Sequence, residues 1–165
     1  MKLVLFRIDD RLVHAQVSVG WVRVLSPDLI LLADDEVASQ AHQIELLALG
    51  LPPKIELAVT RLKNAVDTLN RREQDGEKCI LLVRGPAQAV EVLDAGVQVK
   101  SINIGGMHFA EGKRKLLPYV YVDRGDVEAL EKLASGGTKL VAQDVPGNPA
   151  YDLLKLIRKS QFGKD

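Results

Sequence analysis

The chain has 165 residues, and its 22 Lys and Arg side chains balance its 22 Asp and Glu side chains, so its formal net charge is zero. A neutral chain lacks the broad positive field that draws proteins to nucleic acid or to an acidic membrane surface. Its one cysteine excludes an intramolecular disulfide and a multi-cysteine metal site, which favours a reducing compartment. No apolar run approaches the roughly 20 residues that span a bilayer. These features predict a single cytoplasmic domain over residues 1–165 with no metal, cofactor or nucleic-acid partner.

Short apolar runs alternate with segments of helical periodicity along the chain. Residues 3–8 form the first expected strand, and apolar side chains spaced three to four apart from Val13 to Leu25 predict a helix. Residues 29–33 are apolar on both faces, which is typical of a strand that helices cover on both sides. The same alternation predicts helices near 37–51, 62–69 and 90–93, and strands at 54–59, 79–83 and 101–104.

The last third of the chain continues this order, with a strand at 116–122, a helix at 126–134, a strand at 139–142 and a helix at 151–159. Such alternation predicts an α/β fold with an open, mostly parallel sheet of about seven strands and helices on both faces. Too few residues separate 101–104 from 116–122 for a helical crossover. We therefore expect 116–122 to be the antiparallel strand.

The segment after the first strand is the richest in reactive side chains, and ligands of open α/β sheets bind beyond the carboxyl ends of strands. The His14 imidazole has a nitrogen available near neutral pH as a nucleophile that needs no metal. Arg11 can offer a planar fork to a phosphoryl group, and Arg7 adds a second charge if the loop folds back. Asp9 or Asp10 could orient Arg11 or the imidazole N–H. These groups describe a histidine able to carry phosphate, although a histidine beside acidic residues is also typical of a solvated loop or a helix cap.

The other candidates are weaker, because structural explanations account for them as well. Gly105 and Gly106 permit close backbone approach to a ligand, but a tight turn needs the same residues. His108 follows them at a strand end, so it either lines the same cleft as His14 or lies on an exposed loop. Residues 34–36 are acidic and either bind a cation or cap the next helix, of which capping is favoured. Cys79 opens an apolar strand and is expected in the core.

The segment RIDDRLVHAQVSVGW resembles the IIB component of the mannose/fructose/sorbose class of bacterial sugar phosphotransferase systems. The positions that match the family pattern are Arg7, Asp9, Arg11, His14, Gln16, Val17 and Trp21. Three further family motifs follow in the expected order, at residues 34–38, 52–53 and 103–107. The resemblance therefore extends from about residue 7 to the last helix.

The resemblance implies a phosphotransferase in which His14 accepts a phosphoryl group from the phosphohistidine of a IIA protein. His14 then donates that group to a sugar presented by the membrane components IIC and IID, and the family pattern places the phosphate on Nδ1. The residues expected to hold the phosphate are Arg7, Arg11, Gly105 and Gly106. The residues expected to orient these groups are Asp9, Asp10 and Gln16.

One departure from the family pattern is Ala15, which stands where the family has glycine. If that position needs a positive φ or a close partner contact, the methyl group costs about 1 kcal/mol or more. In a helical position alanine is harmless. The departure keeps open a regulatory IIB-like protein whose phosphorylated His14 signals to a protein partner. A flavodoxin-like small-ligand binder is a weaker alternative, and the sequence leaves the sugar and a homodimer undecided.

Overall fold

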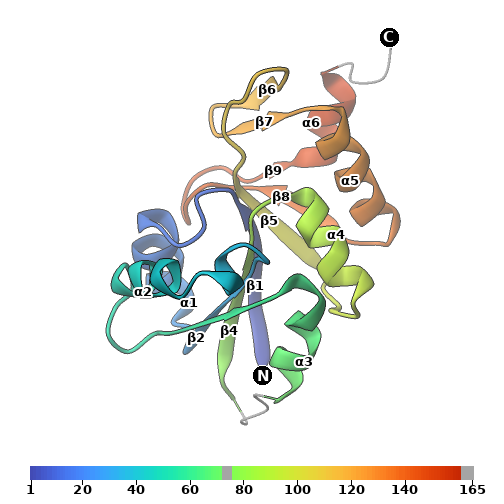
Figure 1. The fold of residues 1–165 in the computed structure, drawn as a ribbon. Coiled ribbons are helices and arrows are strands. Elements are labelled where there is room, and N and C mark those ends of the chain that lie inside the picture. Colours follow the sequence, from blue (N-terminus) through green and yellow to red (C-terminus); the bar gives the residue numbers. More distant parts are fainter. Residues whose placement is uncertain (72–75, 161–165) are drawn as a thin grey trace.

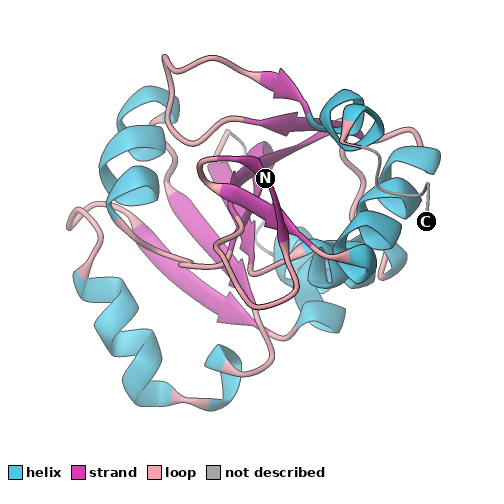
Figure 2. Cartoon of the chain, turned by 90° about the horizontal axis from the view of Figure 1, so that it is seen from above, coloured by secondary structure: helices cyan, strands magenta, loops and turns pink. Residues whose placement is uncertain are grey.

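The computed structural model describes residues 1–71 and 76–160, which form a central sheet between two layers of helices (Figure 1, Figure 2). The seven strands of this sheet have the order β3-β2-β4-β1-β5-β8-β9. Neighbouring strands are parallel except β8 and β9. The predicted fold class is therefore confirmed. The strands are β1 (Lys2–Asp9), β2 (Leu29–Ala33), β3 (Glu56–Thr60), β4 (Lys78–Val83), β5 (Ser101–Gly106), β8 (Lys139–Ala142) and β9 (Tyr151–Asp152).

The central strands are buried because helices cover both faces of the sheet. Every residue of β2 is buried, as are residues 79–83 of β4. Cys79 lies in this buried stretch, as expected. A strand with no solvent-facing side has no position for a polar side chain, which explains why both runs are apolar without alternation.

The helices form two groups on opposite faces (Figure 2). On one face, Val17, Trp21 and Val22 pack with Val37 against β2 and β4. On the other face, Ala65, Val92 and Leu130 join a larger apolar cluster over β1, β4 and β5. The first group is η1 (Gln16–Trp21), α1 (Val22–Leu25), η2 (Val37–Ser39) and α2 (Ala41–Leu49). The second group is η3 (Leu62–Asn64), α3 (Ala65–Arg71), α4 (Pro86–Asp94), α5 (Arg124–Ser135) and α6 (Leu153–Lys159).

The expected single strand at 116–122 is wrong in detail. Two antiparallel strands, β6 (Arg114–Leu117) and β7 (Val120–Val122), form a separate hairpin there. The chain reverses at Pro118, whose fixed φ and missing N–H end the first strand. The antiparallel strand of the main sheet is instead β9, in residues 151–152 that periodicity assigned to the last helix.

The helix expected from Val13 begins later, because residues 10–14 form the loop that carries His14. The first regular turns are those of η1, a π-helix, and the α-helical turn of α1 follows directly. Val17 and Trp21 still face the core, since residues four apart share one side of either helix type. The apolar spacing therefore predicted the buried face, but it did not predict the start of the helix.

The strand order places a topological switch point at the carboxyl ends of β1 and β5, and the region beyond these two strand ends is called the crevice here. From β1 the chain runs toward β2 on one side of the sheet, whereas from β5 it runs toward β8 on the other side. Such a divergence is where ligands bind in open α/β sheets. Within residues 1–71 and 76–160, no helix has the length and apolar composition needed to cross a bilayer.

Candidate functional site

Arg7 lies at the base of the crevice and is completely buried. Its Nη1 donates to Asn103 Oδ1 and, at 3.1 Å, to the Gln143 carbonyl. Its Nη2 donates to Asp9 Oδ2 at 2.8 Å and to the Asp144 carbonyl at 2.9 Å. The guanidinium also stands over the Trp21 ring, 5.6 Å from the ring centroid. Burial lowers the pKa of Arg7, and the Asp9 carboxylate opposes that shift.

The position of Arg7 corrects the expectation that it contacts phosphate. Its side chain has no exposed surface, and both terminal nitrogens already donate to protein acceptors. Arg7 instead joins the ends of β1, β5 and β8 and holds the Asp9 carboxylate in place. Only the tertiary structure could show this, because its partners Asn103 and Asp144 are 96 and 137 residues away.

Gly105 and Gly106 make room for this arrangement. A Cβ atom on Gly105 would lie 1.7 Å from Arg7 Cζ, so no larger residue fits beside the guanidinium. A Cβ atom on Gly106 would lie 2.8 Å from Asp9 Oδ1 and 3.2 Å from Arg11 Nη2. The glycine pair therefore permits close approach of the Arg7 and Asp9 side chains, and its approach to a ligand stays a prediction.

Asp9 links the buried base of the site to its exposed side chains. Its carboxylate is buried, and its Oδ1 accepts from the backbone N–H of Arg11 at 3.3 Å and from Arg11 Nε at 3.2 Å. Its Oδ2 lies 3.6 Å from His14 Nε2. Arg11 Nη2 also donates to Gln16 Oε1, which is 3.4 Å from the same imidazole nitrogen. Asp9 and Gln16 therefore each lie close to both Arg11 and His14, and Arg11 keeps about 36% of its side chain exposed.

His14 lies at the mouth of the crevice, just before the helical turns of η1 begin. Its carbonyl accepts from the backbone N–H groups of Val17 and Ser18, and its ring is 17% exposed. The ring Nδ1 is 2.8 Å from the Leu12 carbonyl oxygen. Because a carbonyl can only accept, Nδ1 carries a proton in this geometry.

Leu12 has a left-handed backbone conformation with φ of 59° although it is not glycine. That conformation costs a non-glycine residue about 1–2 kcal/mol. Two interactions hold it there: burial of the Leu12 side chain and the hydrogen bond from its N–H to the Asp9 carbonyl. The strained turn brings the Leu12 carbonyl to the imidazole.

Asp10 was expected to orient Arg11 or the imidazole of His14. Among the contacts of the described residues it binds neither of these, and it holds His108 instead. Its Oδ2 accepts from the His108 backbone N–H, and its Oδ1 is bonded to His108 Nδ1, both at 2.6 Å. His108 therefore lies at the rim of the crevice, with 46% of its side chain exposed. Of the acidic residues at 34–36, Asp34 accepts from the Val37 N–H at the start of η2 and from Arg84 Nε, whereas the side chain of Glu36, the N-cap residue, makes no capping hydrogen bond.

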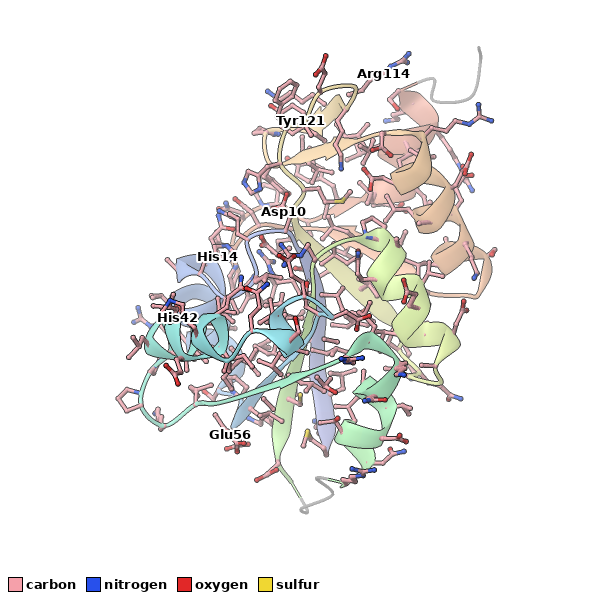
Figure 3. The ribbon with its side chains drawn as sticks, in the orientation of Figure 1. Asp10, His14, His42, Glu56, Arg114 and Tyr121 are labelled. Carbon is pink, nitrogen blue, oxygen red and sulfur yellow. The ribbon has the colours of Figure 1, made fainter. Side chains whose placement is uncertain are left out.

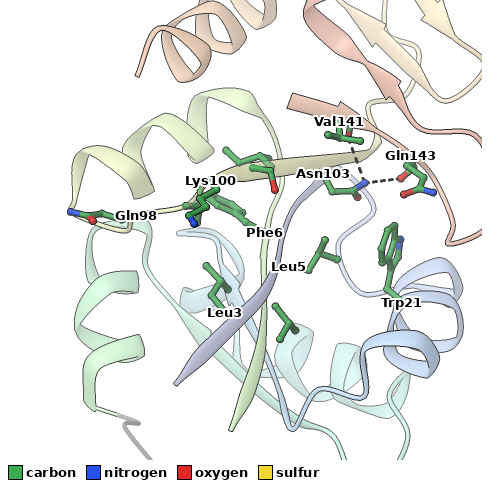
Figure 4. Close-up of a pocket in the computed structure, with 13 residues that line it drawn as sticks. Leu3, Leu5, Phe6, Trp21, Gln98, Lys100, Asn103, Val141 and Gln143 are labelled. Atoms are coloured by element: carbon green, nitrogen blue, oxygen red, sulfur yellow. Dashed lines mark hydrogen bonds between the residues drawn. The ribbon is translucent and has the colours of Figure 1, made fainter. Parts of the chain in front are cut away.

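Sequence reasoning missed the residues that hold Arg7 from beneath. Asn103 accepts from Arg7 and donates through Nδ2 to the Gln143 carbonyl at 3.0 Å (Figure 4). The indole N–H of Trp21 also donates to the Asp144 carbonyl at 3.1 Å. Asn103 and Trp21 line a separate pocket on the sheet face, which His14 does not line. The asparagine two residues before Gly105 was the signal available in the sequence, whereas backbone carbonyl groups that accept hydrogen bonds leave no such signal.

The arrangement can orient an imidazole and place one exposed guanidinium next to it. Among the described residues, no group of three or more His, Cys, Asp or Glu side chains could hold a metal ion. The geometry thus suits transfer of an anionic group to a ring nitrogen, assisted by a fixed cation.

Comparison with known proteins decides the family. Residues 3–165 match the family model described as the PTS system sorbose subfamily IIB component. The chain belongs to this family of IIB components. It is 39% identical over 155 residues to the N-acetylgalactosamine-specific phosphotransferase enzyme IIB component 2 of Escherichia coli, a match covering 94% of this chain and 98% of the relative.

Two further relatives support the assignment of this IIB component. The IIBSor domain of the sorbose permease from Klebsiella pneumoniae has the same fold, with a TM-score of 0.90 and 31% identity over 98% of this chain and 99% of that domain. The mannose-specific EIIAB component of Escherichia coli is 33% identical over 159 residues, which are 96% of this chain and 49% of that protein. The chain is therefore a IIB phosphocarrier, and IIB components of this class are phosphotransferases that work with IIA and with IIC/IID components.

Proposed function

We propose that His14 is the phosphoryl carrier of this IIB component and that its donor is the phosphohistidine of a IIA protein. One observation carries this proposal: the His14 imidazole lies at the β1/β5 crevice, beside the Asp9 carboxylate and the Gln16 side chain. Gln16 in turn accepts a hydrogen bond from the exposed Arg11. Arg11 is the guanidinium able to reach a phosphoryl oxygen, because Arg7 is buried. Arg7 acts through Asp9 as a positioning residue.

The transfer between two imidazoles needs no net movement of protons. The lone pair of one His14 ring nitrogen forms the new N–P bond while the N–P bond of the donor breaks, and that electron pair returns to the donor nitrogen. A proton on the second nitrogen of each ring keeps both rings in a suitable charge state. Such an exchange depends on alignment and on stabilisation of the moving charge, which the Asp9–Arg11 pair supplies.

Transfer at Nδ1, the nitrogen that the family resemblance implies, requires the ring to leave the Leu12 carbonyl. In the structure Nδ1 carries the proton, whereas Nε2 faces the acceptor atoms of Asp9 and Gln16. After the ring turns and Nδ1 loses its proton, an Nε2–H group can donate to Asp9 or Gln16. That proton then remains on Nε2 when the N–P bond breaks, so the His14 ring is a neutral imidazole after the phosphoryl group has been transferred.

In the second half of the reaction, we propose that the phosphoryl group passes from His14 to a hydroxyl of a sugar held by IIC and IID at the cytoplasmic face of the membrane. The sugar oxygen forms the O–P bond, the N–P bond breaks, and the hydroxyl releases its proton. The sugars named for the relatives include N-acetylgalactosamine and sorbose. A sugar of that class is the proposed substrate, with residues 1–165 acting as one IIB domain.

The test is incubation with a phosphorylated IIA protein, comparing the native chain with His14→Gln. The native chain should gain acid-labile, base-stable phosphate, and the variant should gain none. A native chain that stays unphosphorylated refutes the proposal, as does a variant that accepts phosphate at the native rate.

The regulatory alternative is not favoured. The relatives described above carry the names of sugar-specific transport components. Ala15 also gives no reason to doubt the site, because its φ of −52° and ψ of −38° are helical and suit alanine.

A further inference from the structure

An arm of the protein, formed by residues 107–122, stands at the rim of the crevice and presents an exposed aromatic side chain. Phe109 is 70% exposed, and its ring packs edge-to-face on Tyr121 with a centroid distance of 5.8 Å. We propose that Phe109, Tyr121 and Lys115, called here the arm patch, form the docking surface for the protein that delivers the phosphoryl group. This inference rests on the proposed function, since it assigns the partner's contact surface next to His14.

The arm is held rigidly against the site. The Met107 N–H donates to the Tyr119 carbonyl at 2.9 Å, and the Tyr121 N–H donates to the Met107 carbonyl at 2.7 Å. On the other side, Asp10 binds both the backbone and the ring of His108, the neighbour of Phe109. These bonds hold the backbone beside Phe109, so a partner that covers its ring orders little additional backbone on binding.

The three patch residues lie on one side of the arm. Lys115 is paired with Tyr121 across the β6–β7 hairpin, and directly paired residues of antiparallel strands project on the same side. The Tyr121 ring in turn contacts Phe109. In Figure 3, Tyr121, Asp10 and His14 follow one another along the same edge of the molecule. A protein surface that covers His14 therefore also meets the arm.

The chemistry of the two partners favours the phosphoryl donor. The His14 ring is only 17% exposed, so a donor imidazole must approach to about 3–3.5 Å, which brings the two protein surfaces together around the rim. The donor presents an anionic phosphoryl group, whereas the membrane acceptor presents an uncharged sugar hydroxyl. Exposed Lys115 and the half-exposed Arg11, which is paired with Asp9, place two cations on this rim, next to the Asp10 carboxylate that binds His108. An aromatic anchor beside such charges is typical of a protein-binding hot spot.

The experiment measures phosphoryl transfer from phosphorylated IIA at increasing IIA concentration, comparing Phe109→Ser with Val24→Ser. Val24 is a matched control because it is 62% exposed and lies in α1, which leads to the opposite edge of the sheet. Phe109→Ser should raise KM at least tenfold and leave kcat within twofold of the native value, and Val24→Ser should change neither. Lys115→Gln should raise KM about two- to fivefold at low salt and match the native chain near 1 M salt, where the screening length is about 3 Å.

Phosphoramidate, a small donor that needs no docking surface, separates the outcomes. If the native chain accepts phosphate from phosphoramidate but none from phosphorylated IIA, the proposed function fails. If the native chain accepts phosphate from IIA and Phe109→Ser has the native KM, the arm patch is refuted while the function stands. The donor assignment is also overturned if Phe109→Ser slows only the transfer to sugar in the presence of IIC and IID.

Discussion

Gly105→Ala is the most direct test of the buried arginine beneath the site. The new Cβ atom would lie 1.7 Å from Arg7 Cζ and 1.8 Å from Nη2, far inside any permitted contact. The guanidinium is completely buried over the Trp21 ring and among the ends of β1, β5 and β8. The substitution must therefore displace Arg7 from Asp9 and Asn103 or open the ends of these strands.

The expected size of the effect follows from the partners that are lost. Separating a buried ion pair leaves an uncompensated charge and costs about 3–5 kcal/mol. For a chain of this size, each kcal/mol lowers Tm by about 2–4 °C, so Gly105→Ala should lower it by about 6–20 °C. Transfer from phosphorylated IIA should fall as well, since Asp9 then loses the group that fixes it.

Denaturant unfolding of four chains checks this reasoning: native, Gly105→Ala, Arg7→Ala and the double variant. With Arg7 truncated, the added methyl group meets no guanidinium, so its cost should drop below about 1 kcal/mol and the two changes should be strongly non-additive. Gly20→Ala is the control, because its Cβ atom would meet Pro146 Cδ at an ordinary 3.5 Å. Equal costs of Gly105→Ala in both backgrounds, or a native-like Gly105→Ala, would refute the packing of Arg7 under Gly105.

Three further predictions concern the loop, the imidazole and the half-buried Tyr119. Ala15→Gly should cost about 0.5–1 kcal/mol in denaturant unfolding and leave transfer from IIA within twofold, because residue 15 is helical; a more stable variant would contradict that conformation. In the unphosphorylated chain, nitrogen-15 NMR of neutral His14 should find the proton on Nδ1, and a proton on Nε2 would be inconsistent with the Leu12 hydrogen bond. Burial, followed by the Asp144 charge, raises the pKa of Tyr119 above its ordinary value of 10.0. Above that pH the unfolded chain ionises first, so the free energy of unfolding falls as pH rises. Tyr119→Phe should lessen this fall in alkaline unfolding curves, and identical curves would show that the hydroxyl does not contribute.

Local patterns in the sequence predicted the elements that depend on near neighbours. The unbroken apolar runs at 29–33 and 79–83 indicated strands covered on both faces, and the crowded segment after the first strand indicated the loop of His14. Prediction failed where a distant segment or a single residue changed the outcome. Pro118 divided the expected strand at 116–122, and pairing with β8 turned residues 151–152 into a strand instead of a helix.

The charge balance and the motif around His14 determined that any phosphoryl group must be met by a few local side chains. The tertiary structure decided which side chains those are. Arg7 and Arg11 look equivalent in the sequence, yet Arg7 is buried on Asn103 and the β8 loop while Arg11 is exposed beside Gln16. His108 likewise reaches Asp10 across 98 residues. Sequence periodicity indicates whether a position faces the core. Strand order decides which distant side chains meet at the carboxyl ends of the sheet. Only that order distinguishes Arg7, which supports the site, from Arg11, which is exposed to a phosphoryl group.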